Sequence, residues 1–355
     1  MKRYFCTYFD HNYMMYGLTM FRSLVETGID FQIFVLCLSD ETFEKLSGFD
    51  DRLLPIRLQD LEEYDPELKA CKQNRSKVEY IFTISPCLPL FLFNRFPHID
   101  LLTYLDADLY FIASPDGLYE ELGEKSLYII EHRFPANRQF QIDLYGRFNV
   151  AFQIYRNNRT GIDCLSIWRK ECLAWCKDKA EDGKFADQKY LDSWPERYGD
   201  EVVVSQNKGA NLAPWNIDNY SCRFSHDMMK IDGEKVIFIH YQGFRVLTRY
   251  FFKWSSHHQK KENDFNFRFL ARFYHRCLNK TVVTYPELFN NKPLCSFSRE
   301  NYIILFKCSR LAESFSFFRL LQNLYLLLKM LYFNLRHHEE LYFGVFSNKP
   351  KVKSK

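Results

Sequence analysis

The chain has 355 residues and a mass of 42.8 kDa, enough for one large domain or two of ordinary size. Hydrophobic residues make up 47% and charged residues 26%, which excludes a disordered chain, and a content of 13 Gly and 12 Pro excludes collagen-like and low-complexity architecture. A net charge of +4 is too small and too mixed to indicate a nucleic-acid-binding protein.

Strand-like and helix-like segments alternate over the first 130 residues. Aromatic and β-branched runs of strand length lie at residues 3–9, 31–38, 52–58 and 101–112. Helical spacing occupies the intervals at about residues 13–26, 40–48 and 77–94. Pro86 and Pro89 must kink or interrupt the last of these helices. This order predicts an α/β fold with a mostly parallel sheet, helices on both faces and ligands at the carboxyl ends of the strands.

The pattern is less regular beyond residue 130. Two further strands and a helix rich in Trp and Cys are predicted at 147–156, 236–241 and 161–180. The polar run at 255–264 lacks apolar spacing and predicts a linker, after which the sequence is helical and aromatic to about residue 346. The predicted organisation is an α/β domain at 1–254, a linker at 255–264 and a helical, basic extension at 265–355.

The eleven cysteines do not suggest a disulfide or zinc framework. No pair has CxxC spacing, and Cys6 and Cys37 lie in apolar, strand-like runs, so we expect buried free thiols in a reducing cytoplasm. The N-terminus enters a strand pattern directly, which predicts no signal peptide. No window of 18 residues is free of strongly polar side chains, which predicts no transmembrane helix.

Two carboxylates stand in the apolar run at 101–112, in the sequence YLDADLY. On an extended chain Asp106 and Asp108 share a face about 6.6 Å apart, too far for both to hold one cation directly. Either the chain bends at Ala107, or one carboxylate binds a metal and the other a ribose hydroxyl or a metal-bound water. A hard cation that bridges to phosphates suits such a site. Two solvated aspartates at a strand-end turn are the alternative.

Three more segments place polar side chains where chemistry is plausible. His240 closes the apolar run VIFIH, and imidazole is a natural third ligand where two carboxylates hold manganese, although a core histidine is the alternative. Gly243, just after it, would let the backbone approach a phosphate. Asn149, within FNVAF, needs partners that a ligand could supply. Asp187 and Gln188 either bind a polyol or cap a helix.

Taken together, these motifs resemble the retaining glycosyltransferases of the GT-A fold, specifically family 8 and its bacterial relatives. The motifs are TYFDHNY, YLDADLYF, RFNVAFQIYR, DQKYLD and IHYQGF. They follow the family's order at similar intervals and cover about residues 3–245. The resemblance implies a Rossmann-like nucleotide-diphospho-sugar transferase fold, followed here by the helical extension.

The resemblance also implies a role for each motif residue. The ligands of a divalent cation, manganese or magnesium, would be Asp106, Asp108 and His240. The residues lining the nucleotide pocket, for uridine, would be Thr7, Asp10 and Tyr13. The groups that contact the donor sugar or its phosphates would be Arg75 or Lys77, Asn149, Gly243 and Arg245. The residues assisting at the reacting carbon would be Asp187 and Gln188.

The sequence departs from the family at the diphosphate. In the family a Lys commonly follows the His-x-x-Gly, but here Gly243 is followed by Phe244, Arg245 and Val246. Arg245 or Arg249 could take its place, although a guanidinium and an ammonium differ in geometry. The absence of the Lys leaves the diphosphate contact and the donor identity open.

The predicted activity is transfer of a hexose from a UDP-sugar to a glycan or lipid-linked acceptor in surface polysaccharide or lipopolysaccharide assembly. A cation would neutralise the leaving diphosphate, and an amide or carboxylate would stabilise the oxocarbenium-like sugar. One alternative is a nucleotidyltransferase that makes NDP-sugars, against which stands the absence of a Gly-rich loop after the first strand. Another is a degenerate, non-catalytic sugar-nucleotide-binding protein.

The excess positive charge belongs to the C-terminal end, where residues 300–355 carry nine Lys and Arg against four Glu. Residues 315–337 place most of their polar side chains within an arc of about 160°. With the Lys-rich end, this pattern predicts an interfacial membrane helix, and a helix packed on the catalytic domain is the alternative. We therefore predict a cytoplasmic protein, peripheral on the inner membrane if this helix docks there, with no nucleic-acid partner.

Overall fold

The computed structural model describes residues 2–225, 228–247, 251–254, 264–289 and 341–343. The chain divides into two compact units, Met1–Tyr241 and Gln242–Lys355. The predicted linker at 255–264 lies outside the described residues except for Asp264, which begins a helix. The predicted domain boundaries remain predictions.

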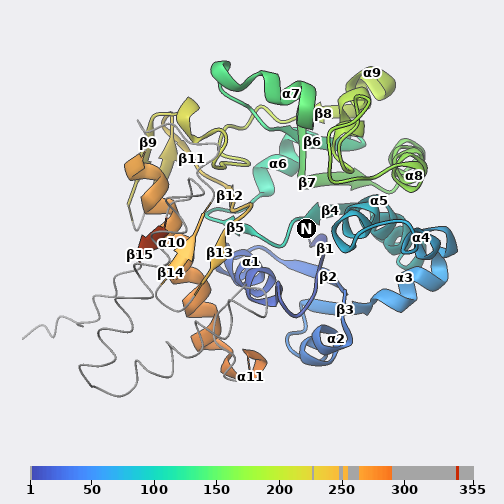
Figure 1. The fold of residues 1–355 in the computed structure, drawn as a ribbon, viewed down its shortest axis with the longest axis horizontal. Helices are drawn as coiled ribbons and strands as arrows, with labels where there is room; N and C mark the ends of the chain where they lie inside the picture. Colours follow the sequence, from blue (N-terminus) through green and yellow to red (C-terminus); the bar gives the residue numbers. More distant parts are fainter. Residues whose placement is uncertain (1, 226–227, 248–250, 255–263, 290–340, 344–355) are drawn as a thin grey trace, which may run out of the picture. The chain divides into compact units, whose positions relative to one another are not determined.

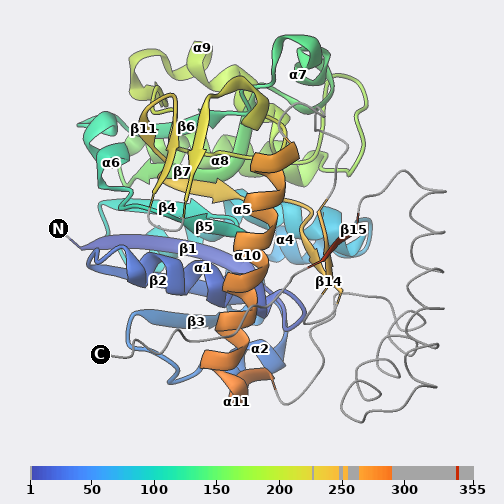
Figure 2. The ribbon, with the colours of Figure 1, turned by 90° about the vertical axis from the view of Figure 1, so that its left-hand side faces the viewer.

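The first unit is built on a seven-stranded sheet in the order β3-β2-β1-β4-β7-β6-β8 (Figure 2). The strands are β1 (Arg3–Phe9), β2 (Phe31–Cys37), β3 (Leu53–Arg57), β4 (Leu101–Leu105), β6 (Leu127–Glu131), β7 (Phe148–Arg156) and β8 (Val202–Val204). Strand β7 is antiparallel to both of its neighbours, and the other pairings are parallel. The predicted α/β class with a mostly parallel sheet is confirmed.

Helices cover both faces of this sheet (Figure 1). They are α1 (Met14–Glu26), α2 (Asp40–Leu46), α3 (Leu58–Tyr64), α4 (Pro66–Cys71), α5 (Lys77–Arg95), α6 (Asp116–Leu122), α7 (Phe140–Tyr145), α8 (Arg159–Ala174) and α9 (Trp194–Tyr198). α1 and α6 lie on one face, and α5 and α8 lie on the other (Figure 1). The core beneath α5 and α8 includes Leu88, Leu92 and Trp168.

Helix α5 is continuous although two prolines lie inside it. Ser76 and Glu79 form a capping box at its start, which satisfies two backbone N–H groups that the first turn cannot pair. Pro86 and Pro89 remove two backbone donors, yet the helix runs from Lys77 to Arg95 without a break. Both prolines are buried, so packing outweighs the lost hydrogen bonds and the helix is not interrupted.

The apolar run at 101–112 forms two strands, where a single buried strand was predicted. β4 ends at Leu105, and β5 (Leu109–Phe111) pairs antiparallel with β12 (Phe238–His240) in a separate two-stranded sheet. The backbone N–H of Asp106 still donates to the Ala151 carbonyl at 2.9 Å. The chain therefore turns between the two sheets at the Asp-x-Asp sequence, as the first of the two alternatives for that motif required.

Smaller elements complete both units. In the first unit a three-stranded sheet contains β9 (Cys222–Phe224), β10 (Met229–Ile231) and β11 (Glu234–Lys235). The second unit contains a sheet of β13 (Arg245–Val246), β14 (Phe251–Lys253) and β15 (Leu341–Phe343), with helices α10 (Asp264–Thr284) and α11 (Pro286–Phe289). The predicted C-terminal helix is present as α10. The prediction of helix was wrong at 341–343, where Leu-Tyr-Phe pairs with β14 as a strand.

The membrane prediction concerns residues outside the described part of the chain. The segment at 315–337 and the Lys-rich end are not among the described residues, so their role stays a prediction. Within the described ranges, no helix combines the length and the apolar character needed to cross a bilayer.

The cysteines that the structure describes are free thiols, as expected. Nine are described, and all of them except Cys222 are buried. Cys295 and Cys308 lie outside the described residues.

A buried ion pair joins α4 to α8. Asp65 is 3% exposed and caps α4 by accepting a hydrogen bond from the Leu68 N–H. The Arg169 guanidinium donates to both oxygens of this carboxylate, at 2.6 and 2.5 Å. Burial raises the pKa of Asp65, but the bonds from Arg169 lower it more, so this pKa lies below its usual value. Asp65 therefore stabilises the fold above its unfolded pKa of about 3.9, and this stabilisation is lost as the pH falls through the lower folded pKa.

Arg169→Ala is expected to lower the free energy of unfolding by about 3–5 kcal/mol at pH 7, because it leaves a buried carboxylate without its counter-ion. The loss should shrink below about pH 4, because Asp65 then takes up a proton in the folded variant and in the unfolded chains, and the unpaired buried charge disappears. Urea unfolding at pH 7 and pH 3.5 measures both values. Arg159→Ala, which removes a 95% exposed side chain of the same helix, should change stability by less than about 0.5 kcal/mol. An equal loss for Arg169→Ala at both pH values would contradict this account.

Candidate metal centre and donor site

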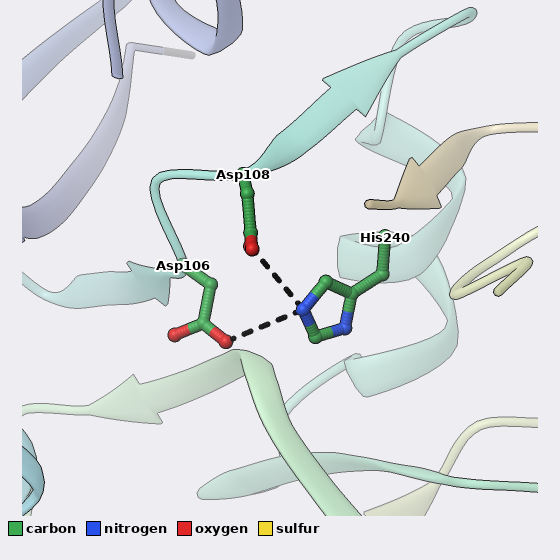
Figure 3. Close-up of side chains that lie close together, drawn as sticks. All are labelled: Asp106, Asp108 and His240. Carbon is green, nitrogen blue, oxygen red and sulfur yellow. Dashed lines mark ion pairs between the residues drawn. The ribbon is translucent and has the colours of Figure 1, made fainter. Parts of the chain in front are cut away.

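Three potential metal ligands converge in the first unit (Figure 3). Asp106 and Asp108 flank the turn between β4 and β5, and His240 ends β12 opposite Leu109. The Nε2 atom of His240 lies 3.2 Å from Asp108 Oδ1 and 3.6 Å from Asp106 Oδ2. One ligand atom from each residue lies within 4.8 Å of the others, so this cluster could hold a metal ion.

The charges of the three side chains affect one another, and the side chains of Asp108 and His240 are buried. Asp108 is 7% exposed and His240 is 2% exposed. Burial raises the pKa of Asp106 to about 6, with His240 lowering it and Asp108 raising it. Burial lowers the pKa of His240, but the two carboxylates raise it more, so this pKa lies above its usual value. Two carboxylates and an imidazole suit a borderline divalent cation such as manganese, so the residues present fit the predicted cofactor.

The sheet topology explains why the cluster forms here. The chain builds β1, β2 and β3 outward in one direction and then returns to place β4 on the other side of β1. Asp10 follows β1 and Asp106 follows β4, so both lie at the carboxyl edge where the strand order reverses. In open α/β sheets this reversal is the usual position of a ligand site.

Two of the three predicted nucleotide residues, Tyr13 and Asp10, connect to the cluster through hydrogen bonds. The Tyr13 hydroxyl donates to Asp108 Oδ2 at 3.3 Å, and its backbone N–H donates to Asp10 Oδ1 at 3.2 Å. The Lys77 ammonium donates to Asp10 Oδ2 at 2.7 Å. Thr7 is fully buried on β1, and its hydroxyl has no hydrogen-bond partner among the described residues. Thr7 therefore lies on β1, Asp10 and Tyr13 follow β1, and Lys77 contacts Asp10.

Asp187 is a buried carboxyl close to the metal cluster. It is 5% exposed, and burial raises its pKa to about 7, with a hydrogen bond from Ser85 lowering it and the charge of Asp106 raising it. Ser85 also shares a hydrogen bond with the Tyr8 hydroxyl at 3.0 Å. The Tyr104 hydroxyl donates to Asp106 Oδ1 at 2.8 Å. These three hydroxyl groups were missed by sequence reasoning, although Tyr8 and Tyr104 lie within the quoted motifs.

The two predicted amides hold protein partners. Asn149 Nδ2 lies 3.3 Å from His132 Nε2, and Asn149 Oδ1 accepts from the Ala151 N–H at 3.2 Å. Gln188 Nε2 donates to the Tyr145 carbonyl at the end of α7, at 2.9 Å. Gln188 precedes a short 3-10 helix, Lys189–Ser193, without a side-chain cap bond, so capping does not explain this residue. His132 was not anticipated from the sequence.

One predicted donor-binding residue contacts another part of the first unit, and two belong to the second unit. The Arg75 guanidinium donates to the Leu173 and Cys172 carbonyls at the end of α8, at 3.1 and 3.5 Å. Gly243 and Arg245 belong to the second unit, where Gly243 has a φ of +73° and Arg245 is exposed in β13. Of the two basic candidates at the start of α5, Lys77 rather than Arg75 contacts a residue of the predicted site, Asp10. The alternative cation Arg249 lies outside the described residues.

No family model matches the chain. Two curated relatives are the uncharacterized proteins YfnD and YfnF of Bacillus subtilis strain 168, each 29% identical to this chain. The matches span 248 and 254 residues, which is 69% of this chain and 79% and 82% of the relatives. These relatives carry no assigned activity in their names.

Solved structures similar to this chain are glycosyltransferases, the class that the sequence motifs resemble. The galactosyltransferase LgtC, in complex with donor and acceptor sugar analogs, is 18% identical, with 68% of this chain and 87% of LgtC covered and a TM-score of 0.47. Mouse xyloside xylosyltransferase 1 is 14% identical, with 68% and 98% covered and a TM-score of 0.46. The glycosyltransferase GlyE of Streptococcus pneumoniae TIGR4 is 18% identical, with 61% and 48% covered and a TM-score of 0.40.

Proposed function

We propose that this protein is a metal-dependent glycosyltransferase of the GT-A type that moves a hexose from a UDP-sugar to a glycan or lipid-linked acceptor. One observation carries the proposal: Asp106, Asp108 and His240 converge at the carboxyl edge of the sheet, where the strand order reverses. Three ligands of this kind leave coordination positions for the oxygens of a diphosphate.

The metal ligands would be Asp106, Asp108 and His240, and the cation, manganese or magnesium, would neutralise negative charge on the leaving diphosphate. Tyr13 supports this arrangement because its hydroxyl donates to Asp108 and so helps to orient the carboxylate. The unpartnered hydroxyl of Thr7 and the Asp10–Lys77 pair offer hydrogen-bonding groups for the nucleotide.

The transferred sugar would lie near Asn149, Asp187 and Gln188. During transfer the bond between the sugar C1 and the phosphate oxygen breaks, and its electron pair leaves with the diphosphate. An acceptor hydroxyl forms the new bond to C1 and passes its proton to an oxygen of the leaving diphosphate. The positive charge that develops on the sugar ring is stabilised by a nearby carboxylate or amide oxygen. Retention of configuration, which the family resemblance implies, requires front-face attack or a covalent intermediate, and Asp187 and Gln188 are the candidates that would assist.

The test is release of UDP from a panel of UDP-hexoses, with and without Mn²⁺, which needs no known acceptor because slow donor hydrolysis accompanies many transfers. We expect release from one preferred donor that depends on the cation. The absence of release from every donor, in protein that binds neither UDP nor Mn²⁺ by calorimetry, would overturn the proposal. Binding of UDP without metal-dependent release in the presence of candidate glycan acceptors would favour the non-catalytic alternative.

A further inference from the structure

Asn211 is a buried amide whose polar atoms are both unsatisfied. The residue is 2% exposed, and neither Nδ2 nor Oδ1 has a hydrogen-bond partner among the residues that the structure describes. A buried polar group without a partner costs about 1–3 kcal/mol, so folded proteins supply one in nearly every case. An amide with a free donor and a free acceptor therefore indicates a ligand or an ordered water at this place.

The backbone fixes Asn211 next to the metal cluster. The Leu212 carbonyl, one residue along the chain, accepts from the N–H of His240 at 2.8 Å. The Leu212 N–H donates to the Phe238 carbonyl at 3.2 Å, so the segment is attached to β12 along its length. Leu212 pairs in parallel with Ile239, so Asn211 belongs to the segment beside the strand that ends in the proposed metal ligand His240.

The same segment is also tied to the proposed sugar-binding amide. Asn216 Nδ2 donates to the Asn211 carbonyl at 2.9 Å and to the His132 carbonyl at 3.0 Å. The His132 side chain in turn lies 3.3 Å from Asn149 Nδ2. The backbone around Asn211 is thus bonded to the strand that ends in His240 and, through Asn216, to the residue that contacts Asn149.

Trp215 makes this part of the site rigid. Its indole N–H donates to the His132 carbonyl at 2.9 Å. Its ring meets His240 edge-on, with ring centroids 5.2 Å apart, and meets His132 at 5.5 Å. A buried tryptophan that contacts both histidines restrains the segment that carries Asn211.

The backbone of Asn211 suggests a second explanation that must be separated from the first. Its φ is +65°, in the left-handed region, which Asn tolerates better than most residues. If the residue were needed only for this conformation, Gly would serve at least as well. The unsatisfied amide has no place in that explanation, since a conformational role does not require burial of two unpaired polar atoms.

We propose that Asn211 binds hydroxyl groups of the transferred sugar and takes part in the choice of donor. The inference rests on the proposed glycosyltransferase function. Neighbouring sugar hydroxyls offer one donor and one acceptor, which is the complement of a carboxamide. Loss of a buried hydrogen bond of this kind weakens binding by a factor of about ten.

The test compares the dissociation constants of UDP and of UDP-hexoses in the presence of Mn²⁺, by calorimetry, for wild type and Asn211→Gly. Gly permits the left-handed backbone but removes the amide. We expect the affinity for UDP to change less than twofold, and the affinity for at least one UDP-hexose, relative to UDP, to fall about tenfold. In the same variant, the rates of UDP release from different UDP-hexoses should differ less from one another than they do in wild type.

Asn219→Gly is the matched control, because Asn219 lies in the same segment and its amide already donates to the Arg133 carbonyl at 2.6 Å. It should leave the ratio of UDP-hexose to UDP affinity unchanged. If Asn211→Gly also leaves this ratio unchanged for every donor, or weakens UDP equally, the inference is wrong and Asn211 serves the backbone or a bound water. Failure of the wild type to bind UDP with Mn²⁺ would instead overturn the proposed function, so the two failures are distinguishable.

Discussion

Asp108→Asn is expected to lower metal-dependent UDP release by a factor of at least about 1000. The substitution keeps the shape of the side chain but removes one of two negative charges from the cluster, and loss of cation binding forfeits several kcal/mol of transition-state stabilisation. The affinity for Mn²⁺, measured by calorimetry, should fall with the activity. The melting temperature should stay close to that of wild type, because Asp108 is hydrogen-bonded by Tyr13 and an amide oxygen can still accept that bond.

Asp163→Asn provides the matched control for this experiment. Asp163 is a 60% exposed carboxylate on α8, paired with Arg159 at 3.8 Å, and surface pairs of this kind contribute little. The control should retain wild-type release and wild-type affinity for Mn²⁺. If Asp108→Asn kept both properties as well, Asp108 would not be a metal ligand.

Asp187→Asn is expected to lower the turnover number by a factor of about 100–1000, with a smaller effect on the KM of the donor. Removal of a group that stabilises a charge developing in the transition state lowers the turnover number by a factor of this size in comparable sites. The reacting sugar is proposed to lie near Asp187, and an amide carries too little negative charge to replace the carboxylate. Steady-state UDP release at saturating Mn²⁺ measures the effect.

The same variant is expected to be more stable than wild type at pH 8. Burial raises the pKa of Asp187 to about 7, far above the value of about 3.9 in an unfolded chain, so the ionised form opposes folding increasingly as the pH rises from 4 to 7. Asn removes this penalty and can keep the bond to Ser85, so the melting temperature should rise by a few degrees at pH 8 and little at pH 4. If Asp187→Asn retained wild-type turnover, Asp187 would not stabilise the reacting sugar. If the variant melted at a lower temperature than wild type at pH 8 alone, the ionised carboxylate would not oppose folding.

Periodicity predicted the elements whose sequences are long and regular. β1, β2 and β3, with the helices between them, lie within a few residues of the predicted ranges. β8 was missed because Val202–Val204 is only three residues long. β6 was also missed, although Gly123 precedes its apolar run Leu127–Glu131. The break between β4 and β5 depends on pairing with β12, about 130 residues later, which no local pattern records.

The metal ligands could be predicted because each is a polar residue at the end of an apolar strand. Only the family resemblance implied their convergence, since no local pattern records the β5–β12 pairing that brings His240 opposite Leu109. Arg75 illustrates the opposite case: a basic residue near the site in sequence whose guanidinium binds the end of α8 instead. No sequence pattern identifies Asn211, because the property that distinguishes it is a buried amide without hydrogen-bond partners among the described residues.

The most direct test of the metal-centre proposal is a crystal structure of the protein with UDP and Mn²⁺, recorded with anomalous scattering from manganese. We predict an anomalous peak within about 2.0–2.3 Å of a carboxylate oxygen of Asp106 or Asp108 and of His240 Nε2, with diphosphate oxygens completing the coordination. Nucleotide density with no peak at this cluster, or a peak at other residues, would contradict the assignment of Asp106, Asp108 and His240 as the metal centre.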